Sequence, residues 1–140
     1  MVSTIWLLLV FSAHPFIFAS ASTKKNIAER LNHVSERTNS SVILVYQKDC
    51  RSCDRLMLQI PCWQKNGIKL AAIGIGDKKL ALRQKTRAYN LKPVLLSFGE
   101  ARASGFNQTP LLFAKAKKHG EWRVLAAEKV TCQKLSSYLN

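Results

Sequence analysis

Short apolar runs separated by polar turns predict buried strands along this chain. The run SVILVYQ at 41–47 is rich in β-branched residues, and IKLAAIGIG at 68–76 has the same apolar character. Unbroken apolar runs of this length are typical of strands that are covered on both faces of a mostly parallel sheet. We therefore expect two core strands at these positions.

Apolar residues at helical spacing predict helices around these strands. They recur from Ile27 to Val34, so we expect a helix from a cap at Ser22 or Thr23 to the polar segment 38–41. This helix should precede the first strand.

Two further helices are expected between and after the strands. The pattern over 50–63 fits an amphipathic helix, which Pro61 should kink or end, and Gly67 should terminate the segment that follows. Asp77 should cap a basic helix over 77–91. Helices thus alternate with the two core strands.

The last third of the chain predicts a hairpin followed by a helix. Residues 92–98 fit either a short strand or a packed loop, and a brief helix is expected over 99–105. The apolar runs 111–116 and 121–127 are separated only by the turn residues KKHG, which indicates a β-hairpin. Thr131 should cap a closing helix. With 140 residues, 47% of them hydrophobic, the chain is expected to form a single α/β domain.

The first residues have the character of an export signal. Residues 1–21 contain no Asp, Glu, Lys or Arg, and they end in Ala19-Ser20-Ala21, the small-x-small pattern of a signal-peptidase site. We expect a signal peptide at 1–21 and the folded domain at 22–140, with no stable membrane span once the signal is cleaved. A retained anchor is the alternative, although the apolar run is short for a bilayer.

The formal net charge of +14 raises the question of an anionic partner. Clustered Lys and Arg bind nucleic acid by releasing counterions from phosphates. Here the basic residues are dispersed, and no nucleic-acid-binding motif or stacking platform accompanies them. A solvated basic surface is the expected explanation, and a basic anion- or nucleic-acid-binding protein is kept as a second alternative.

The chain has four cysteines, and all of them lie in the expected mature part: Cys50, Cys53, Cys62 and Cys132. An exported protein meets an oxidising compartment, where thiols can pair. The Cys50-x-x-Cys53 motif alone is compatible with disulfide exchange, a metal site or an inert staple. No second close Cys or His pair completes a zinc site, so we expect neither a metal nor a cofactor.

The order of these motifs resembles the thioredoxin fold over most of residues 23–140. The resemblance rests on an apolar strand that runs into Cys50-Arg51-Ser52-Cys53 at a helix start, on Thr109-Pro110 at the head of the hairpin, and on the closing helix. It implies a central mixed sheet flanked by helices, with the Thr109–Pro110 peptide bond cis and close to the dithiol. A Thr before this proline is similar to the periplasmic disulfide isomerases.

The resemblance also implies roles for individual residues. Cys50 would be the nucleophile and Cys53 the resolving thiol, because the thiolate attacks a disulfide and a helix N-terminus favours it. Thr109 and Pro110 would bind the substrate. The intervening Arg51 and Ser52 would modulate the dithiol.

The resemblance brings the other two cysteines together as well. The helix after the CxxC motif and the last helix share one face of the sheet in this fold, so Cys62 and Cys132 could form a structural disulfide. The alternative is that both are buried free thiols.

Four positions depart from the thioredoxin pattern. Asp49 stands where thioredoxins have a Trp, and Leu44 stands where they have a buried Asp beneath the dithiol. Arg51-Ser52 replaces Gly-Pro between the cysteines. These departures argue against reductase chemistry of the cytoplasmic kind and leave an exported oxidase, isomerase or reductase.

The functional expectation is therefore an exported, periplasmic thiol-disulfide oxidoreductase. Its partners would be protein thiols or disulfides and a redox partner protein. The first alternative is a thioredoxin-fold assembly or binding component of an envelope machine for conjugation or secretion, with little redox activity.

Overall fold

Five strands form one mixed sheet in the order β3-β2-β1-β4-β5. Their bounds are β1 (Val42–Gln47), β2 (Leu70–Ile75), β3 (Val94–Leu96), β4 (Leu111–Lys115) and β5 (Trp122–Leu125). β1 pairs parallel with β2, and β2 pairs parallel with β3. β4 runs antiparallel to both β1 and β5. The structure is a computed structural model that describes residues 14–116 and 120–139, with side chains from residue 25 onward.

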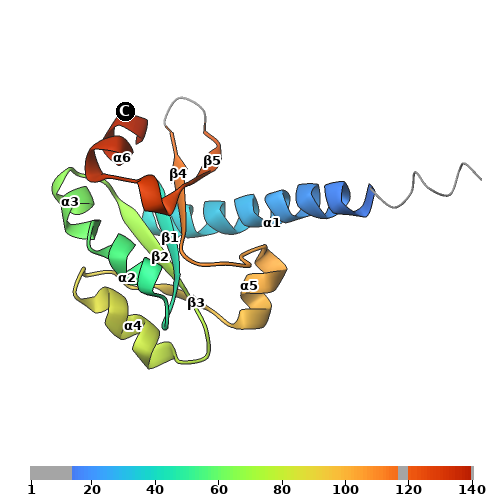
Figure 1. Cartoon of the computed structure of the whole chain (residues 1–140), viewed down its shortest axis with the longest axis horizontal. Coiled ribbons are helices and arrows are strands. Elements are labelled where there is room, and N and C mark those ends of the chain that lie inside the picture. The colour runs from blue at the N-terminus through green and yellow to red at the C-terminus, as the bar shows by residue number, and fades with distance from the viewer. Residues whose placement is uncertain (1–13, 117–119, 140) are drawn as a thin grey trace, which may run out of the picture.

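Helices cover both faces of this sheet. They are α1 (His14–Thr38), α2 (Arg51–Met57), α3 (Ile60–Lys65), α4 (Lys79–Arg87), α5 (Phe98–Ser104), the 3₁₀ turn η1 (Ala127–Lys129) and α6 (Cys132–Leu139). Figure 1 shows α2, α3 and α4 on one side of the sheet, and α1 and α5 on the other. The fold therefore has three layers, with the sheet in the middle.

β1 is the central strand and is buried on both faces. Leu44 and Tyr46 belong to the apolar cluster under α2, α3 and α4, whereas Ile43 and Val45 belong to the cluster under α1 and α5. Side chains of a strand alternate between its two faces, so burial on both faces explains why the run reads as continuously apolar.

A close approach between β1 and β2 explains a glycine in the second strand. Gly74 lies opposite Tyr46 in the parallel register, and the Tyr46 hydroxyl donates a hydrogen bond of 2.6 Å to the carbonyl of Leu82 in α4. A Cβ atom on Gly74 would lie 3.0 Å from Oη of Tyr46 and 3.1 Å from its Cζ. Only glycine leaves room for the Tyr46 ring at this position.

The pairing of β1 with β4 places the start of the hairpin next to the end of the central strand. Val45 is opposite Leu111 in this antiparallel register. The residues that follow β1 and those that precede β4 therefore meet at one edge of the sheet. Cys50 and Thr109 lie in these two connections.

Most of the predicted elements are confirmed. Both core strands and the hairpin are present, and segment 92–98 contains the short strand β3. The side-chain oxygen of Thr131 accepts a hydrogen bond of 3.2 Å from the backbone N–H of Lys134, so the predicted cap of α6 is present. Gly67 ends the segment after α3 with a positive φ of 77°, as expected of a helix-terminating glycine.

Two local predictions are wrong. Ser22 and Thr23 do not cap α1, because the helix begins at His14 and continues through them. Asp77 does not cap α4: the N-cap is Lys78, so the Asp77 side chain is one residue too early to reach the first turn. The predicted break in the amphipathic segment 50–63 is confirmed: the segment forms two helices, α2 and α3, and Pro61, which lacks the N–H that a helix interior needs, stands in the first turn of α3.

Parts of two predictions lie outside the described residues. These are residues 1–13 of the expected signal and residues 117–119 of the expected hairpin turn. The boundary between signal and domain stays a prediction. Within residues 14–116 and 120–139, none of the helices combines the length and apolar character needed to cross a bilayer.

Candidate functional site

Cys50 and Cys53 form a disulfide at the start of α2, with their Cα atoms 5.1 Å apart. Cys50 is the N-cap residue in an extended conformation, and its Sγ accepts a hydrogen bond of 3.1 Å from the backbone N–H of Cys53. The Cys50 side chain is half-buried, whereas Cys53 has no exposed surface. An incoming group therefore reaches Cys50 first.

Thr109 lies against this disulfide from the other connection. Its Oγ1 is 3.8 Å from Sγ of Cys50 and 3.1 Å from Oε1 of Gln47, the last residue of β1. The Thr109–Pro110 peptide bond is cis. The threonine that sequence reasoning selected is thus in contact with the motif 59 residues away.

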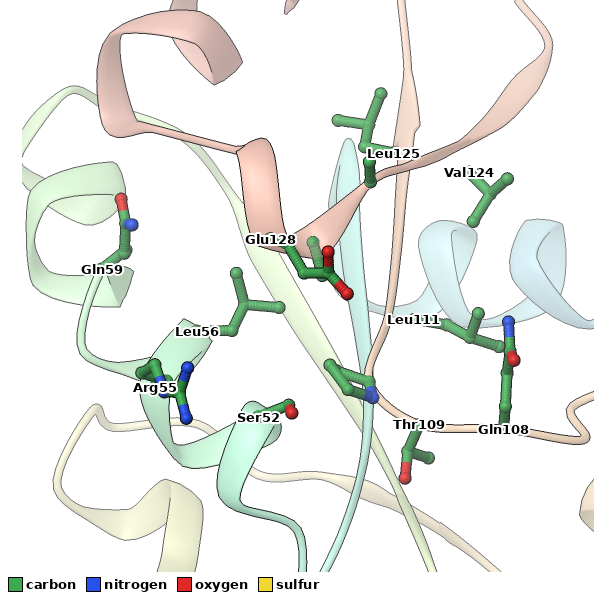
Figure 2. Close-up of a pocket in the computed structure, with 13 residues that line it drawn as sticks. Ser52, Arg55, Leu56, Gln59, Gln108, Thr109, Leu111, Val124, Leu125 and Glu128 are labelled. Atoms are coloured by element: carbon green, nitrogen blue, oxygen red, sulfur yellow. The ribbon is translucent and has the colours of Figure 1, made fainter.

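A groove of about 700 Å³ opens beside the motif. Figure 2 shows Ser52, Arg55 and Leu56 of α2 on one wall and Val124, Leu125 and Glu128 of the β5–η1 segment on the opposite wall. Thr109 and Pro110 lie between the walls, at the start of β4. A groove of this size suits an extended peptide segment better than a small metabolite, because it is open and is lined by polar and charged side chains as well as apolar ones.

The interior beneath the dithiol is apolar. Cys53 packs in the same cluster as Leu44, which is fully buried, so no carboxylate occupies this position. Among the buried residues of the cluster, Tyr46 carries the hydroxyl; burial raises the pKa of this phenol, and a hydrogen bond with Thr86 lowers it to a smaller extent. The position of Leu44 therefore supplies no group that could take up a proton from Cys53.

Comparison with solved structures finds chains of the same architecture. No protein-family model and no curated protein matches the chain. DsbF of Mycobacterium tuberculosis, solved in mixed oxidised and reduced forms, superposes with a TM-score of 0.50 at 17% identity, over 70% of this chain and 76% of that one. The chain has a thioredoxin-like fold.

Two further solved structures are similar at lower scores. A secreted disulfide oxidoreductase of M. tuberculosis, homologous to DsbE of E. coli, gives a TM-score of 0.49 at 17% identity over 70% of this chain and 78% of that one. A thioredoxin-related protein of Neisseria meningitidis serogroup B gives a TM-score of 0.47 at 16% identity, over 71% of this chain and 83% of that one.

The second disulfide of this thioredoxin-like domain ties its last helix to α3. Cys62 and Cys132 are bonded, with Cα atoms 6.0 Å apart. The side-chain amide nitrogen of Asn66 lies 3.0 Å from Sγ of Cys132 and 3.5 Å from Sγ of Cys62. The alternative prediction, that Cys62 and Cys132 are both buried free thiols, is therefore wrong. α6 leads back to η1, so this bond also anchors the segment that forms one wall of the groove.

The fold brings together most of the residues selected from the sequence. Cys50, Cys53 and Thr109 meet, and Ser52, Thr109 and Pro110 line the groove; Arg51 is exposed and lies outside the groove lining. Within the part of the chain that the structure describes, no group of three or more His, Cys, Asp or Glu side chains is arranged to hold a metal ion.

Two polar residues beside the motif were missed by sequence reasoning. Gln47 contacts the Thr109 hydroxyl, and Lys85 of α4 contacts the loop between β1 and α2. A polar residue at the end of an otherwise apolar strand is a signal that points to Gln47. Lys85 is one of several basic residues in its helix, and nothing in the sequence distinguishes it from the others.

Proposed function

We propose that the protein is an exported thiol-disulfide oxidoreductase that acts on protein substrates. One observation carries this proposal: the half-buried Cys50 of the Cys50–Cys53 disulfide is in contact with Thr109, which lines an open groove. A structural disulfide needs neither an accessible sulfur nor an adjoining groove. Cys50 is the nucleophile, and the fully buried Cys53 is the resolving thiol.

The exchange is balanced in atoms and electrons. In the reducing direction the Cys50 thiolate attacks one sulfur of a substrate disulfide, a mixed S–S bond forms, and the other substrate sulfur leaves as a thiolate. The Cys53 thiol loses its proton to solvent and attacks Sγ of Cys50. This step restores the Cys50–Cys53 disulfide and releases the second substrate thiolate. The substrate gains the electron pair that the dithiol loses, and its thiolates take up protons from solvent.

In the oxidising direction the same steps run in reverse. A substrate thiolate attacks Sγ of Cys50, and Cys53 leaves as the thiolate; the second substrate thiol then releases Cys50 and forms the substrate disulfide. Each direction needs a redox partner protein that returns the dithiol to its starting state. The reduction potential of the dithiol decides which direction operates in the cell.

The groove supports roles for the remaining predicted residues. Thr109 and Pro110 bind the substrate segment where the mixed disulfide forms, since both line the groove and the Thr109 hydroxyl lies next to the sulfur of Cys50. Ser52, on the α2 wall, contacts the same segment. Arg51 is exposed at the helix start and places positive charge near the attacking sulfur.

Export to the bacterial periplasm is part of the proposal. It is supported by the uncharged apolar leader that ends in Ala19-Ser20-Ala21, and by two disulfides that involve all four cysteines. Disulfides of this kind persist in oxidising compartments. N-terminal sequencing of the protein from a periplasmic fraction tests the cleavage after Ala21.

A trapping experiment tests the chemistry. The Cys53→Ser variant keeps the nucleophile but cannot resolve, so it should accumulate a mixed disulfide with a scrambled, disulfide-containing substrate protein. Cys50→Ser should form none and should lose insulin reduction and disulfide isomerisation. The double variant Cys62→Ser/Cys132→Ser is the matched control, because it removes two cysteines but leaves the dithiol in place.

The same experiment separates the alternatives. If Cys50→Ser retains full activity, or if both Cys50→Ser and wild type are inactive with every redox substrate, the oxidoreductase proposal is wrong and an assembly or binding component of an envelope machine is favoured. Steep salt-dependent binding of DNA would instead favour the basic nucleic-acid-binding alternative.

A further inference from the structure

The ammonium group of Lys85 makes three polar contacts, all with one short segment. Nζ donates to the carbonyl of Gln47 at 2.9 Å and to the carbonyl of Lys48 at 2.6 Å, and it pairs with Oδ1 of Asp54 at 2.7 Å. An ammonium carries three N–H donors, so these acceptors use all of them. The Lys85 side chain is 17% exposed, which makes it an unusually well-enclosed lysine.

These contacts bracket the dithiol in sequence and in space. Gln47 and Lys48 immediately precede the turn that leads to Cys50, and Asp54 directly follows Cys53. The backbone N–H of Asp54 also donates a hydrogen bond of 3.1 Å to the carbonyl of Cys50. Lys85 thus fixes both ends of the segment from α4, a helix outside the motif. None of its contacts is to a sulfur atom, so none depends on the disulfide being closed.

The ion pair between Lys85 and Asp54 also changes the net charge beside the dithiol. Asp54 stands in the first turn of α2, the helix that Cys50 caps, and a negative charge in that turn opposes formation of a thiolate at the cap. Within the part of the chain that the structure describes, the pair of Lys85 and Asp54 is the one ion pair, despite the large excess of basic residues. Lys85 offsets the charge that would otherwise disfavour the anion.

We propose that Lys85 is a positioning residue that keeps the Cys50 thiolate favoured in the reduced protein, by neutralising Asp54 and holding the β1–α2 loop. The inference rests on the proposed function, because it assigns Lys85 a role in that exchange reaction. It acts through Asp54 and the loop and does not touch the substrate.

Other charged groups face the same region, and their effect on the Cys50 sulfur is the same in the parent protein and in the Lys85 variants. They are Lys48, Asp49 and Arg51 in the loop and helix start, Arg55 in α2, Asp77 and Lys78 across the adjoining hollow, and Glu128 of η1 across the groove. Lys85 differs from all of these because it is bonded to Asp54. Its removal leaves their charges unchanged.

The test measures the thiol itself. In a Cys53→Ser background, which leaves Cys50 as the free thiol beside the Cys62–Cys132 disulfide, the rate of alkylation is followed against pH. Lys85→Met should raise the midpoint by about 0.5–1 pH unit, which slows alkylation below the midpoint about three- to tenfold. Lys85→Arg keeps the positive charge, so its midpoint should lie close to the parent value.

Two further variants control the experiment. Lys79→Met removes the same charge from the same helix but from a residue without a bond to the loop in the described part of the chain, and its midpoint should stay at the parent value. Asp54→Asn should lower the midpoint, and Lys85→Met added to Asp54→Asn should cause less than half of the shift that it causes alone, because the amide carries no charge to offset.

Two results would overturn the inference. One is a Lys85→Met protein that is less stable to urea yet has an unchanged alkylation midpoint, since Lys85 would then serve only the fold. The other is an equal shift with and without Asp54, which would mean direct action on the sulfur. Insulin turnover is measured separately. If the alkylation midpoint depends on Lys85 as expected but the protein has no exchange activity, the proposed function fails while this inference stands.

Discussion

The hydroxyl of Thr109 lies 3.8 Å from the sulfur of Cys50, and its shorter contact, 3.1 Å, is with Oε1 of Gln47. A hydroxyl has a single proton to donate, so it can serve only one of these acceptors at a time. In the disulfide form the amide oxygen of Gln47 is the better acceptor. A Cys50 thiolate would be better still, because charge-assisted hydrogen bonds are roughly twice as strong as neutral ones.

Thr109→Val should therefore make the Cys50 thiol harder to ionise. The change keeps the shape of the side chain but removes the donor, and it should raise the alkylation midpoint of Cys50 by about 0.5 unit. The pH profile of alkylation in the Cys53→Ser background measures this. Thr38→Val is the control, since it removes a comparable hydroxyl, hydrogen-bonded to the Val34 carbonyl at 2.7 Å, at the end of α1. An unchanged midpoint in Thr109→Val would contradict the prediction.

The two disulfides should differ widely in what they contribute to stability. Cys62 and Cys132 are 70 residues apart and Cys50 and Cys53 only 3, and the chain-entropy model assigns the long loop about 4.4 kcal/mol and the short one about 1.6 kcal/mol. Urea unfolding of Cys62→Ala/Cys132→Ala, with Cys50→Ala/Cys53→Ala as its counterpart, measures both. Equal losses would refute the assignment of the long bond as the structural one.

Gly74→Ala should destabilise the domain by about 1–3 kcal/mol, because the added methyl group meets the Tyr46 ring and overpacks the core. Thermal or urea unfolding measures the loss. Gly99→Ala is the matched change: the nearest atom would lie 3.9 Å away, and alanine is the better helix former, so α5 should lose nothing. The Gly74→Ala penalty should shrink when Tyr46→Phe removes the nearest atom.

Glu100 should make stability depend on pH in acid. Its pKa is lowered, chiefly by a hydrogen bond from the backbone N–H of Ser97 and next by the Ser97 side chain. A depressed carboxyl pKa stabilises the fold above the unfolded-state pKa, about 4.3 for glutamate, and this stabilisation disappears as the pH falls through the folded-state value. Wild type should thus be more stable than Glu100→Gln at neutral pH and equal to it in strong acid. A gap that persists in acid would point to packing.

Sequence patterns predicted the parts of the fold that local rules determine. The apolar run of β1, the Cys50-x-x-Cys53 motif after it and the hairpin with its Thr109-Pro110 start all depend on neighbouring residues. Their order along the chain resembles the thioredoxin fold, and it was this resemblance that implied a place for Thr109 close to Cys50. The break between α2 and α3 follows from a local rule as well, because Pro61 cannot stand in a helix interior; the residues at which α2 ends and α3 begins were not predicted, since the pattern of apolar positions continues through the break.

The rest of the candidate site depends on register between distant segments. Lys85 reaches the loop before Cys50 only because α4 packs against that end of the sheet at one particular rotation, and its neighbours in the helix are equally basic. One wall of the groove includes η1, a single short turn that no periodic pattern in the sequence predicts. These contacts join residues that share no local signal.

The long disulfide also determines how the domain would respond to mechanical tension. The Cys62–Cys132 loop encloses β2, β3, β4 and β5 and leaves β1 outside it. A force applied between α1 and α6 passes through the covalent bond, so of the described strands only β1 lies in the force path. Stretching would withdraw the central strand first, and with it the loop that presents Cys50, while the four other strands stay linked to one another.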